Sequence, residues 1–331
     1  MPHRHHVLGM ALTVAITVLL VGVGRTSHAQ TNWTPSRLAD GRPDLQGVWL
    51  SNIATPLQRP TQLAGRASLT PEEVDTLRTR AKRIFQNGRS AFATPESAFF
   101  AALNDVETYE AESTASSIAM EDVEITNRTS QIVHPSDGRI PGLTAAGRIR
   151  QDAVDTGWRF KTGPEDLNSF HRCVTTGVPR VGGNFGAGPY SFYQLVQTQH
   201  YVVFMSEAFH DARIIPLDGR PHLPDSVRQW NGDSRGYWEG DTLVVETRNF
   251  SLNSYFRGSA EGLHLVERFT RTDSETLAYQ LTFADPTTWV SPWTAEIPLK
   301  RRSGPLYEFA CHEGNYSLRG MLRTARLEET Q

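Results

Sequence analysis

The C-terminal half of the chain, from about Tyr190, alternates apolar and polar residues in short runs separated by turn residues. A period of two is typical of β-strands, and a series of such runs with polar turns predicts an antiparallel meander. We therefore expect a mainly β fold whose sheet closes into a barrel or folds as a two-sheet sandwich. The predicted strands are Ser191–Thr198, Tyr201–Glu207, Ala212–Pro216, Gly236–Gly240, Thr242–Arg248, His264–Arg271, Thr276–Ala284, Trp293–Arg301 and Leu306–Ala310.

Residues 30–166 lack this alternation. We expect them to form irregular and helical segments that wrap around a β domain formed by residues 167–331. The run Thr70-Pro71-Glu72-Glu73 supplies an N-cap, a proline at the first helical position and the acid of a capping box. Apolar residues then recur at helical spacing, so a helix is expected to begin at Thr70 and to end near Gly88. Weaker patterns predict a short strand at Gly47–Leu50 and further helices within Ala91–Met120 and from Thr144.

The first 29 residues have the pattern of a secretory signal peptide. Arg4 and its neighbouring histidines precede the apolar run Val7–Val23, and Ser27-His28-Ala29 supplies an A-x-A-like cleavage site. The run is about as long as the shortest membrane-spanning helices, so an uncleaved anchor is the alternative. No Cys stands at the cleavage point to accept a lipid, and no later apolar run is as long. We expect cleavage, and hence a periplasmic or secreted protein with no stable membrane anchor.

Composition and charge limit the kinds of binding partner that we expect for this protein. The chain has 33 Lys and Arg against 36 Asp and Glu, with 38% apolar residues, which is ordinary usage for a globular protein. The predicted signal peptide contains two Arg and no acidic residue, so the mature chain is more acidic still. Because the basic residues form no stripe, nucleic acid is not an expected partner. A small-molecule ligand or substrate is expected instead.

Two cysteines, Cys173 and Cys311, remain in the mature chain. An even number of cysteines in an exported protein predicts one disulfide, with two buried thiols as the alternative. The bond would join the segment before the Gly-rich loop Gly182–Gly188, which we expect at the mouth of a barrel, to the end of the last predicted strand. It would gather polar residues at one rim, namely His171, Arg172, His312 and Glu313.

Four segments resemble a family of exported, uncharacterised proteins of soil bacteria: Arg42–Trp49 (RPDLQGVW), His210–Gly219 (HDARIIPLDG), Trp238–Val245 (WEGDTLVV) and Cys311–Tyr316 (CHEGNY). The resemblance covers most of the mature chain and implies an exported bacterial protein, without implying any chemistry. The rhythm of Trp238–Thr242 and of the strands after it is also similar to that of lipocalin-like binders of small ligands. This second resemblance implies a lipocalin-like barrel.

Histidines beside acidic residues carry the predicted chemistry. An imidazole that is uncharged near neutral pH is well matched to accept a proton, and a neighbouring carboxylate can orient it. Strand parity adds a further case, because His264 and Glu267 lie on opposite faces of one predicted strand. Whichever face is inside, a titratable group enters the interior. The candidate catalytic residues are therefore His210, Asp211, His312, Glu313, His264 and Glu267.

Residues predicted to contact the substrate come from the same strands and from the rim. Glu246 shares a strand face with Val244 and is expected to point into a partly polar barrel interior. Structural alternatives stay open, because the acids could form cross-strand ion pairs, His210-Asp211 could be a turn and the aromatic residues could belong to the core. The candidates for substrate binding are His171, Arg172, Glu246, Arg268, Tyr237 and Trp238.

Metal and cofactor motifs are absent from the sequence. The imidazoles and carboxylates match no local ligand spacing, so a divalent metal, kept as an alternative, would need ligands that the fold brings together. No G-x-S-x-G motif is present for a serine nucleophile. No cofactor is expected. The residues considered for a metal are His210, Asp211, His222, His264, His312 and Glu313.

Two functions are consistent with these patterns. The His–acid neighbours favour an exported enzyme, a lyase, isomerase or hydrolase, that performs acid–base chemistry on a small molecule. The alternative is a non-catalytic, lipocalin-like periplasmic carrier that binds an apolar ligand. Two imidazoles with an acid in hydrogen-bond reach would favour the enzyme. An apolar cavity with every histidine at the surface would favour the carrier.

Overall fold

The structure is a computed structural model that describes residues 33–51, 53–85, 95–107, 123–157, 161–175 and 192–329. The predicted signal peptide and the Gly-rich loop Gly182–Gly188 lie outside the described residues. All the elements below belong to one compact unit, Thr34–Gln331.

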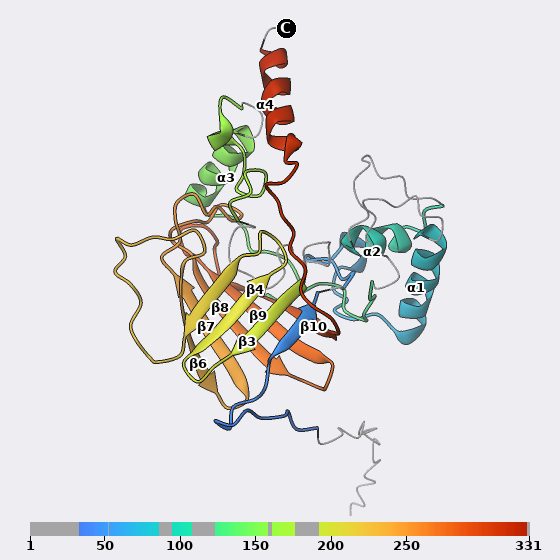
Figure 1. Cartoon of the computed structure of the whole chain (residues 1–331). Coiled ribbons are helices and arrows are strands. Elements are labelled where there is room, and N and C mark those ends of the chain that lie inside the picture. Colours follow the sequence, from blue (N-terminus) through green and yellow to red (C-terminus); the bar gives the residue numbers. More distant parts are fainter. Residues whose placement is uncertain are drawn as a thin grey trace, which may run out of the picture. The chain divides into compact units, whose positions relative to one another are not determined.

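Ten strands form one antiparallel sheet, so the expectation of a mainly β fold is confirmed (Figure 1). The hydrogen-bonded order is β5-β4-β3-β1-β10-β9-β8-β7-β6, and β2 pairs with β10 beside this path. β1 and β2 show that the irregular N-terminal part of the chain also contributes strands. The bounds are β1 Gly47–Leu50, β2 Ile132–His134, β3 Phe192–Gln197, β4 Tyr201–Ser206, β5 Ala212–Pro216, β6 Asp233–Glu239, β7 Thr242–Arg248, β8 His264–Arg271, β9 Thr276–Ala284 and β10 Trp293–Arg302.

Leaving β2 aside, strands that are neighbours in the sheet are also neighbours in the chain, from β1 to β5 and from β6 to β10. The pairing of β10 with β1 joins these two runs of strands. Within residues 192–329, β5 and β6 are the successive strands that share no ladder, so the sheet is not closed into a barrel. We call this gap in the hydrogen bonding the seam. Side chains cover it: a Cβ added at Gly236 of β6 would lie 2.7 Å from Leu217 and 3.0 Å from Ile215. The missing side chain at Gly236 therefore lets β5 and its neighbour Leu217 pack over β6.

The predicted strand bounds agree closely with the structure for β5, β7, β8 and β9. The predicted strand Leu306–Ala310 is wrong, since its described contact is one bridge between Phe309 and Ala208. Pro305 stands just before this segment and has no backbone N–H to donate to a ladder.

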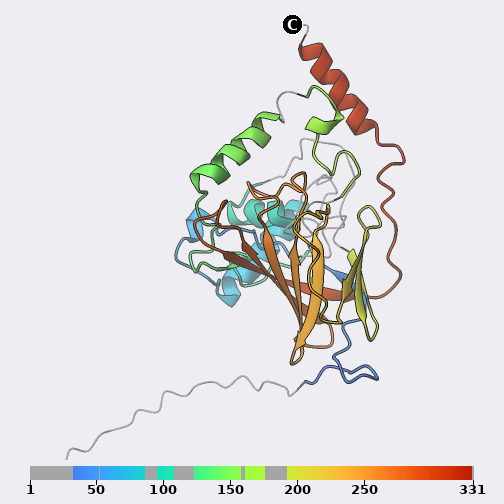
Figure 2. The ribbon, with the colours of Figure 1, turned by 90° about the vertical axis from the view of Figure 1, so that its left-hand side faces the viewer.

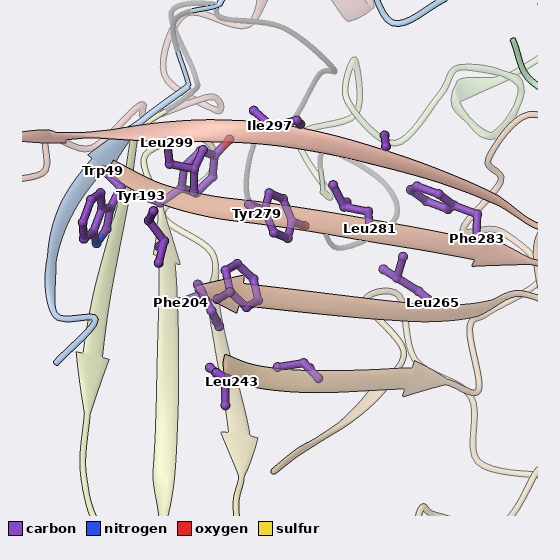
Figure 3. Packing of buried hydrophobic residues seen from close by; sticks show 14 of the residues in the cluster. Trp49, Tyr193, Phe204, Leu243, Leu265, Tyr279, Leu281, Phe283, Ile297 and Leu299 are labelled. Atoms are coloured by element: carbon purple, nitrogen blue, oxygen red, sulfur yellow. The ribbon is translucent and has the colours of Figure 1, made fainter. Parts of the chain in front are cut away.

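The core lies on the concave face of the sheet, where side chains from distant strands meet (Figure 3). Phe204 of β4 and Phe269 of β8 have ring centroids 4.7 Å apart, although they lie on opposite halves of the sheet. Phe283 and Trp293, on neighbouring strands, stack at 4.3 Å. These contacts show that the sheet curls until β4 packs over β8.

The described residues also form four α-helices: α1 Pro71–Phe85, α2 Pro95–Leu103, α3 Ala145–Gly157 and α4 Tyr316–Glu328, with short 3-10 turns at Thr61–Leu63 and Pro164–Asp166. The capping box before α1 is confirmed, because Thr70 N–H donates to Glu73 and Glu73 N–H donates back to the Thr70 hydroxyl. Val74 and Leu77 of α1 pack with Phe99 of α2 in a second small core that is separate from the sheet core.

Cys173 and Cys311 form the predicted disulfide. The segment after β10 runs back along the sheet to α4 (Figures 1 and 2), and the disulfide fixes it to residues 161–175 on the way. Arg326 of α4 adds a hydrogen bond to the carbonyl of Thr162. In the parts of the chain that the structure describes, no helix has both the length and the apolar character of a membrane span.

Candidate functional site

Strand parity on β7 and β8 sorts the predicted site residues by face. Leu265, Glu267 and Phe269 share the core face of β8, so Glu267 is the buried acid that one reading of the sequence predicts. Glu246 pairs with Val266 across the β7–β8 ladder and lies on the opposite, outer face. The prediction that Glu246 points into a barrel interior is therefore wrong. His264 and Arg268 lie on the outer face too, so they do not line the interior.

Glu267 forms a buried ion pair with Arg213 of β5. Both terminal guanidinium nitrogens of Arg213 donate to the carboxylate, one of them to Oε1 at 3.1 Å, and the Tyr279 hydroxyl donates to Oε1 at 2.7 Å. Arg213 also donates to Ser234 and Thr247 at 3.1 and 3.3 Å. Burial lowers the pKa of Arg213, but the charge and hydrogen bonds of Glu267 more than offset this, and the pKa stays above its ordinary value.

This ion pair joins four strands across the seam. Arg213 belongs to β5, and its partners Ser234, Thr247 and Glu267 belong to β6, β7 and β8. The guanidinium and carboxylate groups are engaged with one another and with neighbouring hydroxyl groups. A pair held in this way is suited to fix the curl of the sheet, and the geometry gives no support to Glu267 as a proton-transfer group.

His210 and Asp211 form the turn between β4 and β5, as the structural alternative holds. Phe209 and His210 have φ angles of 59° and 53°, which lie in the left-handed region. His210 is exposed, and the Asp211 carboxylate accepts a hydrogen bond from Asn231 at 2.6 Å. In the described structure Asp211 is thus engaged with Asn231, and the prediction of a His210–Asp211 catalytic pair gains no support.

The disulfide rim brings His171 and His312 near each other, as predicted. Asn315 donates its backbone N–H to the His312 carbonyl at 3.3 Å and its side-chain amide to the His171 carbonyl at 3.0 Å. Burial, with Lys161 as a further cause, lowers the pKa of His171. His312 and Glu313 are exposed, and Arg172 is half-buried. The rim thus joins the two segments through backbone carbonyls, and its imidazoles are not shown to converge.

A different His–acid pair lies at one end of β6. Nδ1 of His222 is 2.9 Å from Oδ2 of Asp233, and the N–H of Leu223 donates to the same oxygen at 2.9 Å. Arg235 donates to Oδ1 of Asp233 at 2.6 Å. Asp233 is 5% exposed, so a buried carboxylate with three donors fixes the imidazole. Since a carboxylate accepts, Nδ1 of His222 is the donor, and Nε2 is the ring nitrogen left to accept a proton.

A second His–acid pair lies beside the first. Nε2 of His264 is 3.4 Å from Oε2 of Glu246, and the Tyr237 hydroxyl is 3.4 Å from Oε1 of the same carboxylate. Burial is the main cause that lowers the pKa of His264, and the charges of Arg248 and His222 lower it further against the opposing effect of Glu246. Burial thus favours the neutral form of the His264 imidazole. The interaction with His222 places both pairs in one electrostatic environment.

The ladder register explains why these residues meet. Asp233 pairs with Arg248, and Arg235 pairs with Glu246, so the outer-face side chains of β6 and β7 stand opposite one another. His264 is the first residue of β8 at the same end of the sheet. His222 arrives from the loop before β6, which Asn249 anchors by donating to the Leu223 carbonyl at 2.8 Å. We call His222, Asp233, His264 and Glu246 the outer-face site.

Of the other predicted substrate-binding residues on these strands, one contacts the outer-face site and two do not. Tyr237 joins it through Glu246. Trp238 faces the core and packs against it, as the structural alternative proposes for the aromatic residues. Arg268 forms an ion pair with Glu239 at 2.7 Å. Sequence reasoning missed Asp233, because the predicted strand began at Gly236 and β6 begins earlier, at Asp233 itself.

Metal ligation finds no support among the described residues, where no group of three or more His, Cys, Asp or Glu side chains is placed to bind an ion. In the outer-face site the imidazoles and carboxylates are organised as two pairs: His222 and Asp233 are hydrogen-bonded, and His264 lies 3.4 Å from Glu246.

Comparisons with known proteins add no family. A scan against protein-family models found no match to the chain, and searches of curated proteins and of solved structures found none either.

Proposed function

We propose that this protein is an exported enzyme that performs acid–base chemistry on a small molecule, as a lyase, isomerase or hydrolase, at the outer-face site. The single observation that carries the proposal is the hydrogen bond between His222 and the buried Asp233 carboxylate. A carboxylate that fixes one imidazole nitrogen leaves the other oriented to exchange a proton with a bound molecule.

The two imidazoles have different surroundings, which suits them to different roles. His222 is held by Asp233 and would accept a proton at Nε2, with the developing imidazolium stabilised by the carboxylate. Burial lowers the pKa of His264, which favours its proton-accepting form, and the Glu246 carboxylate lies 3.4 Å from Nε2. After taking a proton from the substrate, the His222 imidazolium can return it to a leaving group or to another atom of the substrate, so the proton balance closes on His222, with His264 as a second proton acceptor beside it.

The competing function is a carrier for an apolar ligand. It would use the concave face of the curled sheet, which is occupied by large, fully buried side chains such as Trp49, Tyr279 and Phe283 (Figure 3). It gives no role to the outer-face site. Two imidazoles, each with a carboxylate near or within hydrogen-bond distance, are the arrangement that favours the enzyme.

The test is a turnover screen on the mature protein with small esters, hydroxy acids and epimerisable acids, followed by NMR. His222→Gln and His264→Gln should each lower turnover about 10²- to 10⁴-fold, the usual contribution of a general acid or base. His210→Gln is the matched control, because this exposed imidazole lies in a turn, and it should retain full turnover. Equal turnover in all three variants would refute the proposal. Binding of apolar ligands without turnover of any compound would support the carrier.

A further inference from the structure

Three arginines lie on the outer face around the site, and they differ in how fully they are engaged. Arg235 is 16% exposed and donates to Asp233, to the Ser234 carbonyl and to the Pro221 carbonyl. Arg268 is 36% exposed and donates to Glu239 at 2.7 Å. Both guanidinium groups are held by good hydrogen bonds within the protein.

Arg248 differs from both. Its side chain is 51% exposed, and its contact with Oε2 of Glu246 has a length of 3.5 Å, at the limit of a hydrogen bond. A guanidinium has five N–H donors in a planar fork that matches the two oxygens of a carboxylate or phosphate. Arg248 can therefore receive an oxyanion without giving up a short hydrogen bond to the described residues.

Glu246 is held as loosely. Its contacts with Tyr237, His264 and Arg248 all measure between 3.4 and 3.5 Å. Hydrogen bonds in catalytic sites are often long before a substrate binds and shorten in its complex. These long contacts surround Glu246. The exposed Arg248 guanidinium is one of them; its charge acts on His264, and its backbone pairs with that of Asp233.

We propose that Arg248 binds an oxyanion group of the substrate, a carboxylate or a phosphate, and so places the substrate between His222 and His264. This inference rests on the proposed function and adds the chemical class of its substrate. Arg248 pairs with Asp233 across the β6–β7 ladder, so an anion on its guanidinium lies next to the fixed His222–Asp233 pair. Arg248 is a substrate-binding residue in this account, whereas Arg235 positions Asp233.

The placement has a consequence that can be measured without a known substrate. The charged and titratable groups that act on His264 are Arg248 and Glu246 from β7 and His222 from the loop before β6. An anion bound at Arg248 would add a negative charge beside His264 and favour its protonated form. By linkage, protonation of His264 must strengthen anion binding by the same factor.

The experiment follows the imidazole resonances of His222 and His264 by NMR while sulfate or acetate is added, with potassium chloride at matched ionic strength as the reference. Sulfate represents a tetrahedral oxyanion, acetate represents a carboxylate, and both keep their charge between about pH 6 and about pH 8, on either side of the ordinary imidazole pKa. Saturable shifts are expected with at least one of the two anions. Binding should be tighter at the lower pH.

Variants separate the outcomes. Arg248→Gln should weaken anion binding at least tenfold, whereas the matched control Arg268→Gln should bind as the wild type does. Unchanged binding in Arg248→Gln, or shifts no larger than those with chloride, would overturn the proposal. The proposed function fails separately, through undiminished turnover in His222→Gln. If turnover is lost in His222→Gln but no anion binds at Arg248, the proposed enzymatic function is supported and only the proposal of an oxyanion-binding Arg248 is refuted.

Discussion

The ion pair between Arg213 and Glu267 should be the strongest single polar determinant of the sheet's curl. Each partner can be replaced with an apolar residue of similar size, in the single variants Arg213→Met and Glu267→Leu and in the double variant. Glu267 is fully buried and the Arg213 side chain is 11% exposed, so either single substitution leaves a charge in the core without its partner.

The expected cost follows from this burial. Removing one partner of a buried pair destabilises a protein by about 3–5 kcal/mol, whereas replacing both with apolar residues is often close to neutral. The unfolding entropy of about 2.1 cal/mol/K per residue, taken over roughly 300 residues, makes 4 kcal/mol equivalent to about 6 °C in Tm. The double variant should therefore recover most of what each single variant loses.

Equilibrium unfolding in urea, followed by tryptophan fluorescence, measures these free energies. The matched control is Arg268→Met, which breaks an exposed ion pair on the same strand as Glu267 and should cost less than about 1 kcal/mol. Two results would show that the two charges are not coupled in the core: single variants no less stable than the control, or a double variant whose loss of stability equals the sum of the two single losses.

Three further predictions concern the rim, the end of β4 and the seam. Cys173→Ala should lower the free energy of unfolding by about 2–5 kcal/mol, because the disulfide closes a loop with a sequence separation of 138 residues; a change below about 1 kcal/mol would contradict a structural bond. Glu207 has a buried carboxylate oxygen with no hydrogen-bond partner among the described residues, and burial raises its pKa to about 7. The folded protein thus holds the proton of Glu207 more tightly than the unfolded chain does. The free energy of unfolding therefore falls as pH rises from the ordinary glutamate pKa towards 7. Glu207→Gln should raise Tm at pH 8 and leave Tm unchanged at about pH 4. An equal effect at both values of pH would refute that assignment. Gly236→Ala should cost about 1–3 kcal/mol in urea unfolding by forcing Ile215 and Leu217 away from β6, and a neutral result would show that the seam is loosely packed.

Local pattern was enough to predict the strands of the C-terminal half. The ladder from β7 to β9 has the predicted bounds because each strand alternates cleanly and ends at a polar turn. The pairing of β1 between β10 and β3 could not be predicted in the same way. A four-residue strand far away in the chain carries no local signal of its partners, and its place depends on burying Trp49 in the sheet core.

The candidate site was predicted only in part. His264, Glu246 and Tyr237 were singled out from the sequence, but the face of β7 could not be settled. Apolar residues occupy both of its faces, since Leu243, Val244 and Val245 are all buried. His222 lies in an irregular loop, and its contact with Asp233 depends on how that loop folds back. Histidines adjacent to acids in the sequence were a poor guide, since neighbouring residues in a turn or on a strand point their side chains apart.

The tautomer of the His222 ring shows whether Asp233 orients this imidazole for proton transfer. Long-range ¹H–¹⁵N NMR correlations report which ring nitrogen carries the proton of a neutral imidazole. Neutral His222 should be protonated at Nδ1, with Nε2 bare, and Asp233→Ala should remove this preference while the backbone spectrum stays that of the folded protein. A wild-type His222 protonated at Nε2, or a tautomer that Asp233→Ala leaves unchanged, would show that Asp233 does not orient this imidazole.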